Sequence, residues 1–229
     1  MAAGSWPSWD DDVMDAAGGQ EHWQRVYATK APDALSWYAP HLQRSLALIE
    51  RAANDRTAAI LDAGGGASTL VDDLLARGYT NLAVLDIAKE AIAAAQSRLG
   101  ERAARVRWLC ADLLSAALEP AALAVWHDRA VFHFLTGDAA RRRYAEQAAA
   151  ALCPGGHLLV STFALDGPER CSGLPVRRYD AASLQTAFAP RFRLIESATE
   201  QHRTPSGAIQ PFVDGHFVLE HESAAAEQH

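Results

Sequence analysis

The chain has 229 residues, of which 49% are hydrophobic and 21% charged, and these values are typical of a single globular domain. Its formal net charge of −7 argues against a nucleic-acid partner, because an acidic domain repels phosphate backbones. The sequence contains neither an apolar run long enough to span a membrane nor a secretory signal pattern. Cys110, Cys153 and Cys171 lack disulfide or zinc-ligand spacing, so we expect a cytoplasmic protein without metal or membrane partner.

The chain divides into a central domain and two short ends. Residues 1–20 are predicted to form a mobile N-terminal arm, residues 21–221 one domain with an N-terminal lid, and residues 222–229 a tail. The first core helix is predicted to open at Pro40, because apolar residues follow it at helical spacing as far as Ala53.

Strand and helix patterns then alternate along the domain. Short apolar runs predict strands at residues 59–61, 82–85, 106–109, 123–126 and 157–163. The helices that follow the first two runs are predicted to stop at Gly78 and Gly100. Asp138 is predicted as the N-cap of a helix that reaches about Leu152, and Asp180 as the N-cap of a shorter helix. This alternation predicts an α/β fold with a parallel sheet and helices on both faces.

Two further strands, at residues 192–196 and 212–219, have no helical pattern between them. Without a crossover helix they are predicted to form a C-terminal antiparallel hairpin. The expected sheet therefore has seven strands and is mostly parallel.

A glycine-rich turn follows the first predicted strand, in the segment Asp62-Ala63-Gly64-Gly65-Gly66. Glycines at the end of a strand let the backbone approach a ligand closely, and Gly64 and Gly66 are the candidates for that contact. Asp62 suits a ligand that carries an ammonium group and would repel a pyrophosphate. Thr69 stands where a dinucleotide-binding turn has Gly or Ala.

Two more acids follow the next two predicted strands. Asp86, with Ile87 beside it, can accept hydrogen bonds from ribose hydroxyls. Asp112 can accept the amino group of an adenine while the backbone N–H of Leu113 donates to the ring. Three acids that end three successive strands predict one nucleoside-binding site at the carboxyl edge of the sheet.

With these residues, the chain resembles the class I methyltransferases that depend on S-adenosylmethionine (SAM), over roughly residues 20–220. The segment Asp62-Ala63-Gly64-Gly65-Gly66 looks like their first motif, and the turn Leu152-Cys153-Pro154-Gly155-Gly156 resembles a later one. Gly65-Gly66-Ala67 departs mildly from the sequence that many members have there. The resemblance implies a Rossmann-like fold and SAM as the cofactor.

A narrower resemblance connects the chain with a group of small bacterial methyltransferases. It covers residues 22–27, residues 36–38 and the segment Trp126-His127-Asp128-Arg129-Ala130-Val131-Phe132-His133-Phe134-Leu135. Trp23 and Tyr27 lie four residues apart, so one helix face presents both, and we predict that they form a lid over the cofactor sulfonium. Packing of that helix on the sheet is the alternative. Trp37 and Tyr38 are candidates for lining the acceptor pocket.

The segment after the fourth predicted strand faces the transferring methyl group in this family. His133, Asp128 and His127 are the candidate catalytic residues, because an imidazole can remove a proton from the acceptor and a carboxylate can orient an amine. Arg129 could hold a carboxylate of the acceptor or pair with Asp128. The loop at residues 166–179 is predicted to border the acceptor pocket.

We therefore expect a SAM-dependent methyltransferase that acts on a small molecule, with protein lysine as the alternative acceptor. A nicotinamide-dependent oxidoreductase is a rival, but the sequence lacks a Tyr-x-x-x-Lys hydride-site pair. A SAM-binding protein without catalysis and an aminopropyl transferase are further rivals on the same fold. The methylated atom and the oligomeric state stay open.

Overall fold

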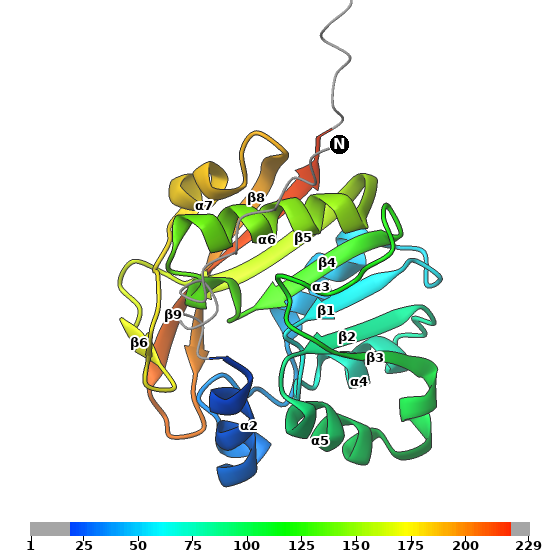
Figure 1. Cartoon of the computed structure of the whole chain (residues 1–229), viewed down its shortest axis with the longest axis vertical. Helices are drawn as coiled ribbons and strands as arrows, with labels where there is room; N and C mark the ends of the chain where they lie inside the picture. The colour runs from blue at the N-terminus through cyan, green and yellow to red at the C-terminus, as the bar shows by residue number, and fades with distance from the viewer. Residues whose placement is uncertain (1–18, 221–229) are drawn as a thin grey trace, which may run out of the picture.

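One seven-stranded sheet runs through the protein in the order β3-β2-β1-β4-β5-β9-β8 (Figure 1). The computed structural model describes residues 19–220, so most of the predicted arm (1–20) and the predicted tail (222–229) lie outside the described residues. The strands of the sheet are β1 (Ile60–Ala63), β2 (Leu82–Asp86), β3 (Val106–Cys110), β4 (Leu123–Arg129), β5 (Leu152–Phe163), β8 (Phe192–Arg203) and β9 (Ile209–Leu219).

The pairing of these strands confirms the predicted fold class. The five strands from β3 to β5 pair in parallel, and β9 runs antiparallel to both of its neighbours, β5 and β8. Parallel strands joined by crossover helices end at the same edge of the sheet, so the turns after β1, β2, β3 and β4 meet there.

Helices cover both faces of the sheet (Figure 1). One face is covered by α3 (Gln43–Ala52), α4 (Leu70–Ala76) and α5 (Lys89–Leu99), and the other by α6 (Asp138–Ala151) and α7 (Ala181–Phe188). Helix α2 (Gly19–Thr29) lies beside α5, where the side chain of Gln20 donates to the carbonyl of Ile87 at 3.2 Å. None of the helices in the described part of the chain is long and apolar enough to cross a membrane.

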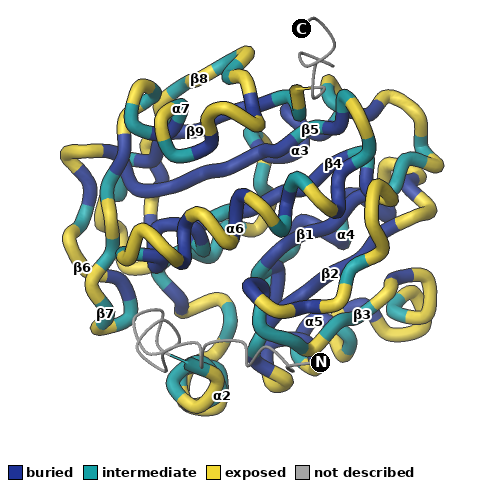
Figure 2. The backbone as a smooth tube through the Cα atoms, turned by 45° about the horizontal axis from the view of Figure 1, so that its top comes forward, coloured by how far each residue is buried: buried dark blue, intermediate teal, exposed yellow. Residues whose placement is uncertain are grey.

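Neighbouring residues of the central strands point into two different cores. Ile60 and Val125 pack in the core beneath α3 and α4, whereas Leu61 and Trp126 pack in the core beneath α6 and α7. Because both faces are covered, β1 and β4 begin with uninterrupted apolar residues, and their polar residues come only toward the carboxyl ends. Figure 2 shows the central strands buried along their length.

Of the two predicted helix N-caps, one is confirmed and the other is wrong. Asp180 caps α7 as predicted. Its carboxylate accepts from the N–H of Ser183 at 2.8 Å, and the hydroxyl of Ser183 accepts from the backbone N–H of Asp180. The prediction that Asp138 is an N-cap is wrong, because Gly137 holds that position and Asp138 is the first helical residue. There its carboxylate pairs with Arg141, one turn further along the helix.

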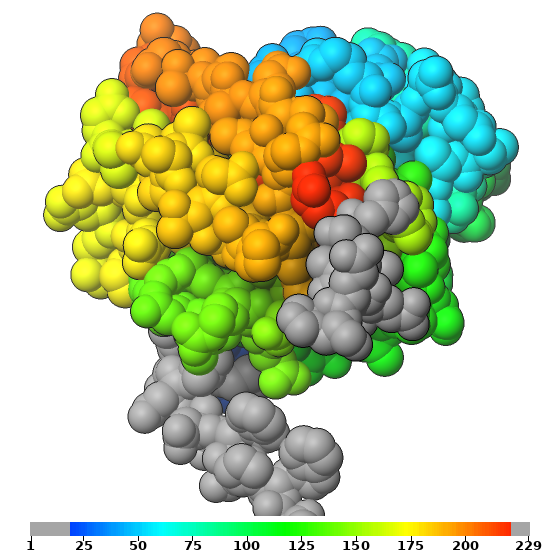
Figure 3. All heavy atoms as spheres, turned by 90° about the horizontal axis from the view of Figure 1, so that it is seen from above, coloured from blue at the N-terminus to red at the C-terminus, as the bar shows by residue number. Residues whose placement is uncertain are grey.

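The C-terminal hairpin is longer than the sequence predicted and is tied to the rest of the domain. Viewed from above, the yellow-to-red C-terminal part of the chain forms one continuous side of the molecule (Figure 3). Arg44 of α3 donates from Nε to Asp214 of β9 (3.0 Å) and from Nη2 to Glu196 of β8 (2.8 Å). This pairing fixes the hairpin against the face that carries α3.

Candidate active site

A pocket opens at the carboxyl edge of the sheet, where the turns after β1, β2, β3 and β4 meet. Its walls come from two parts of the chain. Residues between Gly19 and Leu42 form the outer wall, and the strand-end turns form the floor. In sheets of parallel strands, ligands bind at this edge, outside the carboxyl ends of the strands.

The turn after β1 requires glycine for two separate reasons. Gly64 has a φ of +70°, and a Cβ there would collide with Cγ2 of Val131 in the turn after β4. Gly66 has a φ of +34°, and a Cβ there would lie 2.5 Å from Oδ2 of Asp86. The glycines therefore bring the ends of β1, β2 and β4 together. Gly64 lines the pocket, whereas Gly66 lies beneath Asp86 and does not.

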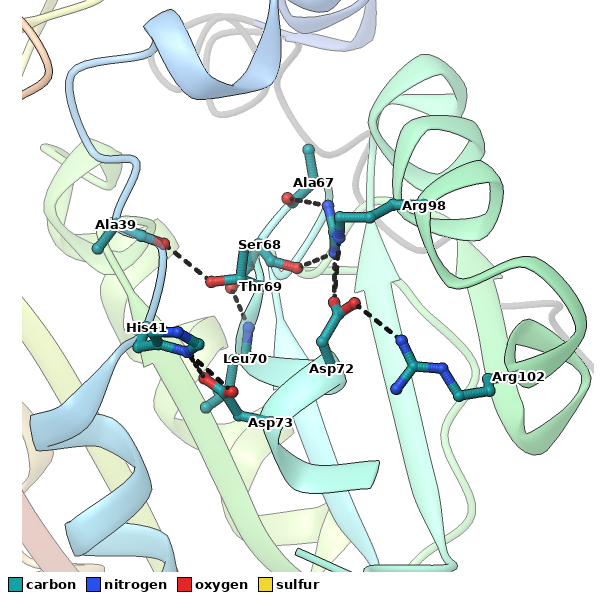
Figure 4. Close-up of polar contacts among 10 residues, drawn as sticks. All are labelled: Ala39, His41, Ala67, Ser68, Thr69, Leu70, Asp72, Asp73, Arg98 and Arg102. Carbon is teal, nitrogen blue, oxygen red and sulfur yellow. Dashed lines mark hydrogen bonds and ion pairs between the residues drawn. The ribbon is translucent and has the colours of Figure 1, made fainter. Parts of the chain in front are cut away.

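A second layer of contacts holds the glycine turn from behind (Figure 4). Arg98 of α5 donates to the carbonyls of Ala67 (2.9 Å) and Ser68 (2.6 Å). The hydroxyl of Thr69 donates to the carbonyl of Ala39 (2.9 Å), which joins the turn to the outer wall of the pocket. Sequence reasoning missed Arg98, and it used Thr69 only to exclude a dinucleotide turn.

Asp62 and His127 meet in a buried hydrogen-bond chain. His127 Nδ1 donates to Asp62 Oδ1 at 2.8 Å, and Nε2 lies 2.9 Å from the hydroxyl of Ser45 in α3. All three residues are buried, and Asp62 and His127 line the pocket. The second oxygen of Asp62, Oδ2, is buried and has no hydrogen-bond partner within residues 19–220. An acceptor of this kind is costly unless a ligand satisfies it.

Asp86 ends β2 as a buried carboxyl that lines the same pocket. It accepts from the N–H of Ala88 at 2.8 Å. Burial, with a smaller contribution from the charge of Asp62, raises its pKa to about 7 in spite of the hydrogen bond from Ala88. A carboxyl held this way is ready to accept hydrogen bonds from a ligand that excludes water.

Asp112 lies two residues beyond the end of β3, not at its end as predicted, and it also lines the pocket. Its Oδ1 accepts from the N–H of Leu114 at 2.7 Å, which fixes the turn. Ile87 and Leu113 line the pocket beside Asp86 and Asp112. The structure thus brings together the three acids that the sequence placed at one site.

Aromatic side chains form the outer wall of the pocket. Trp23 of α2 meets Phe134 edge-on with 5.0 Å between ring centroids, and it meets Trp37 at 6.0 Å. Tyr27, one helical turn further, meets Trp37 at 6.3 Å. Burial, and then the charge of Asp86, raise the pKa of the Tyr27 hydroxyl well above its ordinary value. Trp37 and Tyr38 line the pocket, as the sequence predicted.

Arg129, the last residue of β4, places a guanidinium at this aromatic end. Its Nη1 donates to the carbonyl of Trp37 at 2.9 Å, and its Cζ lies 4.6 Å from the centre of the Phe212 ring. His202 of β8 makes a parallel tether, with Nε2 at 2.8 Å from the carbonyl of Ser36. The segment that carries Trp37 is therefore held from two strands.

Comparison with known protein families identifies the kind of domain that contains this pocket. The family model described as a methyltransferase domain matches residues 60–156, which include the three acids, β4 and the turn after it. The chain carries a methyltransferase domain. The family resemblance and the enzyme class predicted from the sequence are confirmed. No curated protein matches the chain in sequence.

Solved structures share the fold of this methyltransferase at low sequence identity. The 1,6-didemethyltoxoflavin-N1-methyltransferase of Burkholderia thailandensis, with 1,6-didemethyltoxoflavin and S-adenosylhomocysteine (SAH) bound, has a TM-score of 0.72 and 21% identity, over 96% of this chain and 95% of that one. The N-methyltransferase NodS of Bradyrhizobium japonicum, solved with SAH, has a TM-score of 0.68 and 17% identity, over 90% and 100%. A structure described for the conversion of a disulfide bond into a thioacetal group during echinomycin biosynthesis has a TM-score of 0.72 and 22% identity, over 89% and 94%.

Of the three predicted catalytic residues, the methyltransferase brings only His127 to the pocket. Asp128 is fully buried behind the wall, where it accepts from the hydroxyl of Tyr144 (2.7 Å) and from the N–H of Val131 (3.1 Å). Burial raises its pKa to about 6. These contacts support the turn after β4, so the structure favours a positioning role for Asp128.

His133 is also fully buried and lies outside the pocket wall. Its ring packs between Phe134 (4.5 Å) and Phe163 (4.6 Å), and neither ring nitrogen has a hydrogen-bond partner within the described chain. Burial, and then the charge of Arg129, lower its pKa to about 3, so the imidazole is neutral. It cannot contact an acceptor in this arrangement.

The loop at residues 166–179 does not border the pocket, and that prediction is wrong. It forms a small hairpin of β6 (Arg170–Cys171) and β7 (Leu174–Pro175). Cys171 packs with Phe134 and Phe212, behind the aromatic wall, and burial raises the pKa of its thiol to about 11. The loop supports the wall instead of lining it. Among residues 19–220, no group of three or more His, Cys, Asp or Glu side chains is placed to hold a metal.

Proposed function

We propose that this methyltransferase transfers a methyl group from SAM to a small-molecule acceptor bound against the aromatic wall. The observation that carries the proposal is one pocket with two chemically different ends. We call the floor with Asp62, Asp86 and Asp112 the acidic end and the outer wall with Trp23, Tyr27 and Trp37 the aromatic end, and the two adjoin where the charge of Asp86 acts on the hydroxyl of Tyr27. A cofactor and an acceptor of different chemistry can lie side by side in such a pocket.

The acidic end fits the cofactor. The unsatisfied Oδ2 of Asp62 offers an acceptor to the ammonium of the methionine part. Asp86, which ends β2, offers its carboxylate to ribose hydroxyls, and Asp112 and Leu113 lie where they can meet the adenine. Trp23 and Tyr27 offer aromatic faces to a cationic sulfur. We propose these residues, with Ile87 and Gly64, as the cofactor contacts, and Gly66 as the support of Asp86.

When bound, SAM supplies an electrophilic methyl group on a positively charged sulfur. What the chain itself contributes is alignment and exclusion of water. The aromatic wall and the turn after β4 hold the acceptor at the open side of the pocket. SAM would give its methyl group to the acceptor atom and leave as SAH, and a proton on that atom would pass to solvent.

His127 acts in this proposal as a positioning residue. Both of its ring nitrogens are bonded, one to Asp62 and one to Ser45, so neither is free to take a proton from an acceptor. Its role is to fix the orientation of the Asp62 carboxylate. Asp128 and His133 do not line the pocket, and their role is to support the turn that carries Val131 and Phe134.

A small acceptor is favoured over a protein side chain. Residues between Gly19 and Leu42 wall the pocket on its outer side, and a compact acceptor fits beneath such a wall more readily than a peptide. The neighbours in structure include an enzyme solved with 1,6-didemethyltoxoflavin.

Calorimetric titration with SAM, SAH and NADH tests the cofactor, and transfer of tritium from methyl-labelled SAM tests the acceptor class. We expect micromolar SAM and SAH binding, no NADH binding, and label in the small-molecule fraction of a cell extract. Label in protein alone would replace the small acceptor by a protein one. NADH binding without SAM binding would overturn the proposal.

A further inference from the structure

The guanidinium of Arg129 stands out among the polar groups of the pocket. Arg129 lines the pocket, yet its Nη2 is buried and has no hydrogen-bond partner within residues 19–220. The described chain also offers it no carboxylate within 4.0 Å. Within the described residues its one hydrogen bond runs from Nη1 to the carbonyl of Trp37.

Arg44, on the same face of the sheet, provides a comparison, because its guanidinium is fully paired with carboxylates. Arg44 donates to Asp214 at 3.0 Å and to Glu196 at 2.8 Å, so two carboxylates neutralise it. Burial is the largest influence on Arg129 and lowers its pKa, whereas the charges of Glu200, Asp214 and Asp62 act on it only from longer range and raise the pKa. A buried cation is normally paired, which leaves Arg129 short of one anionic partner.

The surroundings of Arg129 define the shape of the missing partner. One face of the guanidinium lies on Phe212, and the neighbouring pocket wall consists of Trp37, Phe134 and Trp23. Aromatic walls favour a flat apolar body, and a guanidinium fork favours a carboxylate or a similar planar anion. The acids on the floor of the pocket repel that anion, so its carboxylate can bind only toward Arg129.

We propose that Arg129 is the acceptor-selecting residue, and that the acceptor is a planar aromatic acid whose carboxylate pairs with its guanidinium. The proposal rests on the proposed function, because it assigns the acceptor side of that pocket. Nη2 supplies the donor that the bound acid satisfies, and the ring of the acid lies against the aromatic wall. A neutral carboxamide of the same shape leaves the cation unpaired.

The test compares acids with their own carboxamides on the SAH-loaded protein. The probes are 2-naphthoate, quinoline-2-carboxylate and indole-3-carboxylate, each titrated against the matching amide by calorimetry. We expect at least one acid to bind the wild type about tenfold more tightly than its amide, as one charge-assisted hydrogen bond provides. Arg129→Gln keeps a donor for the Trp37 carbonyl but removes the charge, and it should bring acid and amide to equal affinity.

His202→Phe is the matched control. It removes the other tether of the same segment, at the Ser36 carbonyl, and leaves the cation in place. We expect it to keep the preference for the acid. If no acid binds the wild type better than its amide, if Arg129→Gln keeps the preference, or if His202→Phe loses it equally, the proposal is overturned.

The cofactor is measured separately so that the two proposals fail separately. SAH affinity is expected to change by no more than about threefold in Arg129→Gln, because Arg129 is not among the proposed cofactor contacts. If SAH does not bind the wild type, the proposed function fails. The same pairs of acids and amides titrated into the protein alone then decide the role of Arg129.

Discussion

The acidic end and the aromatic end of the pocket are held in place in different ways. At the acidic end, Asp86 and Asp112 each accept a hydrogen bond from the backbone two residues further on, so the strand-end turns fix them locally. At the aromatic end, Trp37 and Ser36 are held by side chains 92 and 166 residues away. The acidic end is therefore as rigid as the sheet, whereas the aromatic end depends on two long-range tethers.

This difference separates what the two ends can do. Rigid strand ends suit a cofactor that does not change, and a tethered segment suits an acceptor that differs from enzyme to enzyme. Substitutions at the acidic end should therefore remove cofactor binding, and substitutions of Trp37 or Arg129, which are not among the proposed cofactor contacts, should leave it nearly intact.

The largest effect is expected from Asp86→Ala. Loss of two hydrogen bonds to a charged acceptor costs about 3 kcal/mol, which corresponds to about a hundredfold weaker SAH binding by calorimetry. Trp37→Leu at the aromatic end is the comparison variant, and its SAH affinity should fall by no more than about threefold. Equal losses in the two variants would contradict the division of the pocket into two ends.

The next effect concerns the stability of the glycine turn. Gly64→Ala places a Cβ against Val131 at a φ of +70°, and we expect the free energy of unfolding to fall by about 2 kcal/mol. Gly78→Ala is the matched control: its φ is +86°, but nothing lies within 4 Å of the added Cβ. That control should lose only about 1 kcal/mol, the cost of the backbone conformation. Chemical denaturation measures both, and equal losses would mean that the contact with Val131 does not matter.

The acidic end was also the part of the site that the sequence predicted best. Asp62, Asp86 and Asp112 come from successive strand ends, and the parallel topology brings successive strand ends to one edge. The positions of these acids along the chain were therefore enough to predict that they share one site. The contact of Arg98 with the glycine turn was missed, because it depends on how α5 packs and not on any local pattern.

The aromatic end shows where sequence reasoning stops. Trp37 was predicted to line the pocket, but nothing in its neighbourhood pointed to Arg129 or His202 as the residues that hold it. His133 carried a plausible catalytic side chain, yet packing between two Phe rings buries it. Residue type suggested chemistry at these positions, and tertiary packing decided whether the group could reach a ligand.

A smaller effect is expected from His127→Leu, which removes the partner of Asp62 without touching Asp62 itself. The carboxylate loses its 2.8 Å bond and its fixed orientation, so SAH affinity should fall about tenfold. Ser45→Ala breaks only the far end of the same chain and should change the affinity by less than about threefold. If Ser45→Ala weakens SAH binding as much as His127→Leu, the effect comes from packing of α3 and not from the orientation of Asp62.

The smallest effect is a pH dependence that only the acidic end should show. Burial raises the pKa of Asp86 to about 7, so the carboxylate forms as the pH rises through that value. SAH affinity should then increase by up to about tenfold between pH 6 and pH 8, and Asp86→Asn should bind weakly with no such increase. The stability of the cofactor-free protein has the opposite sign. A raised carboxyl pKa means that the folded state holds its proton more tightly than the unfolded chain, so stability declines as the pH rises toward 7. Asp86→Asn should remove that decline in denaturation experiments. A flat SAH profile in the wild type, or the same slope in Asp86→Asn, would show that Asp86 does not control cofactor binding through its charge.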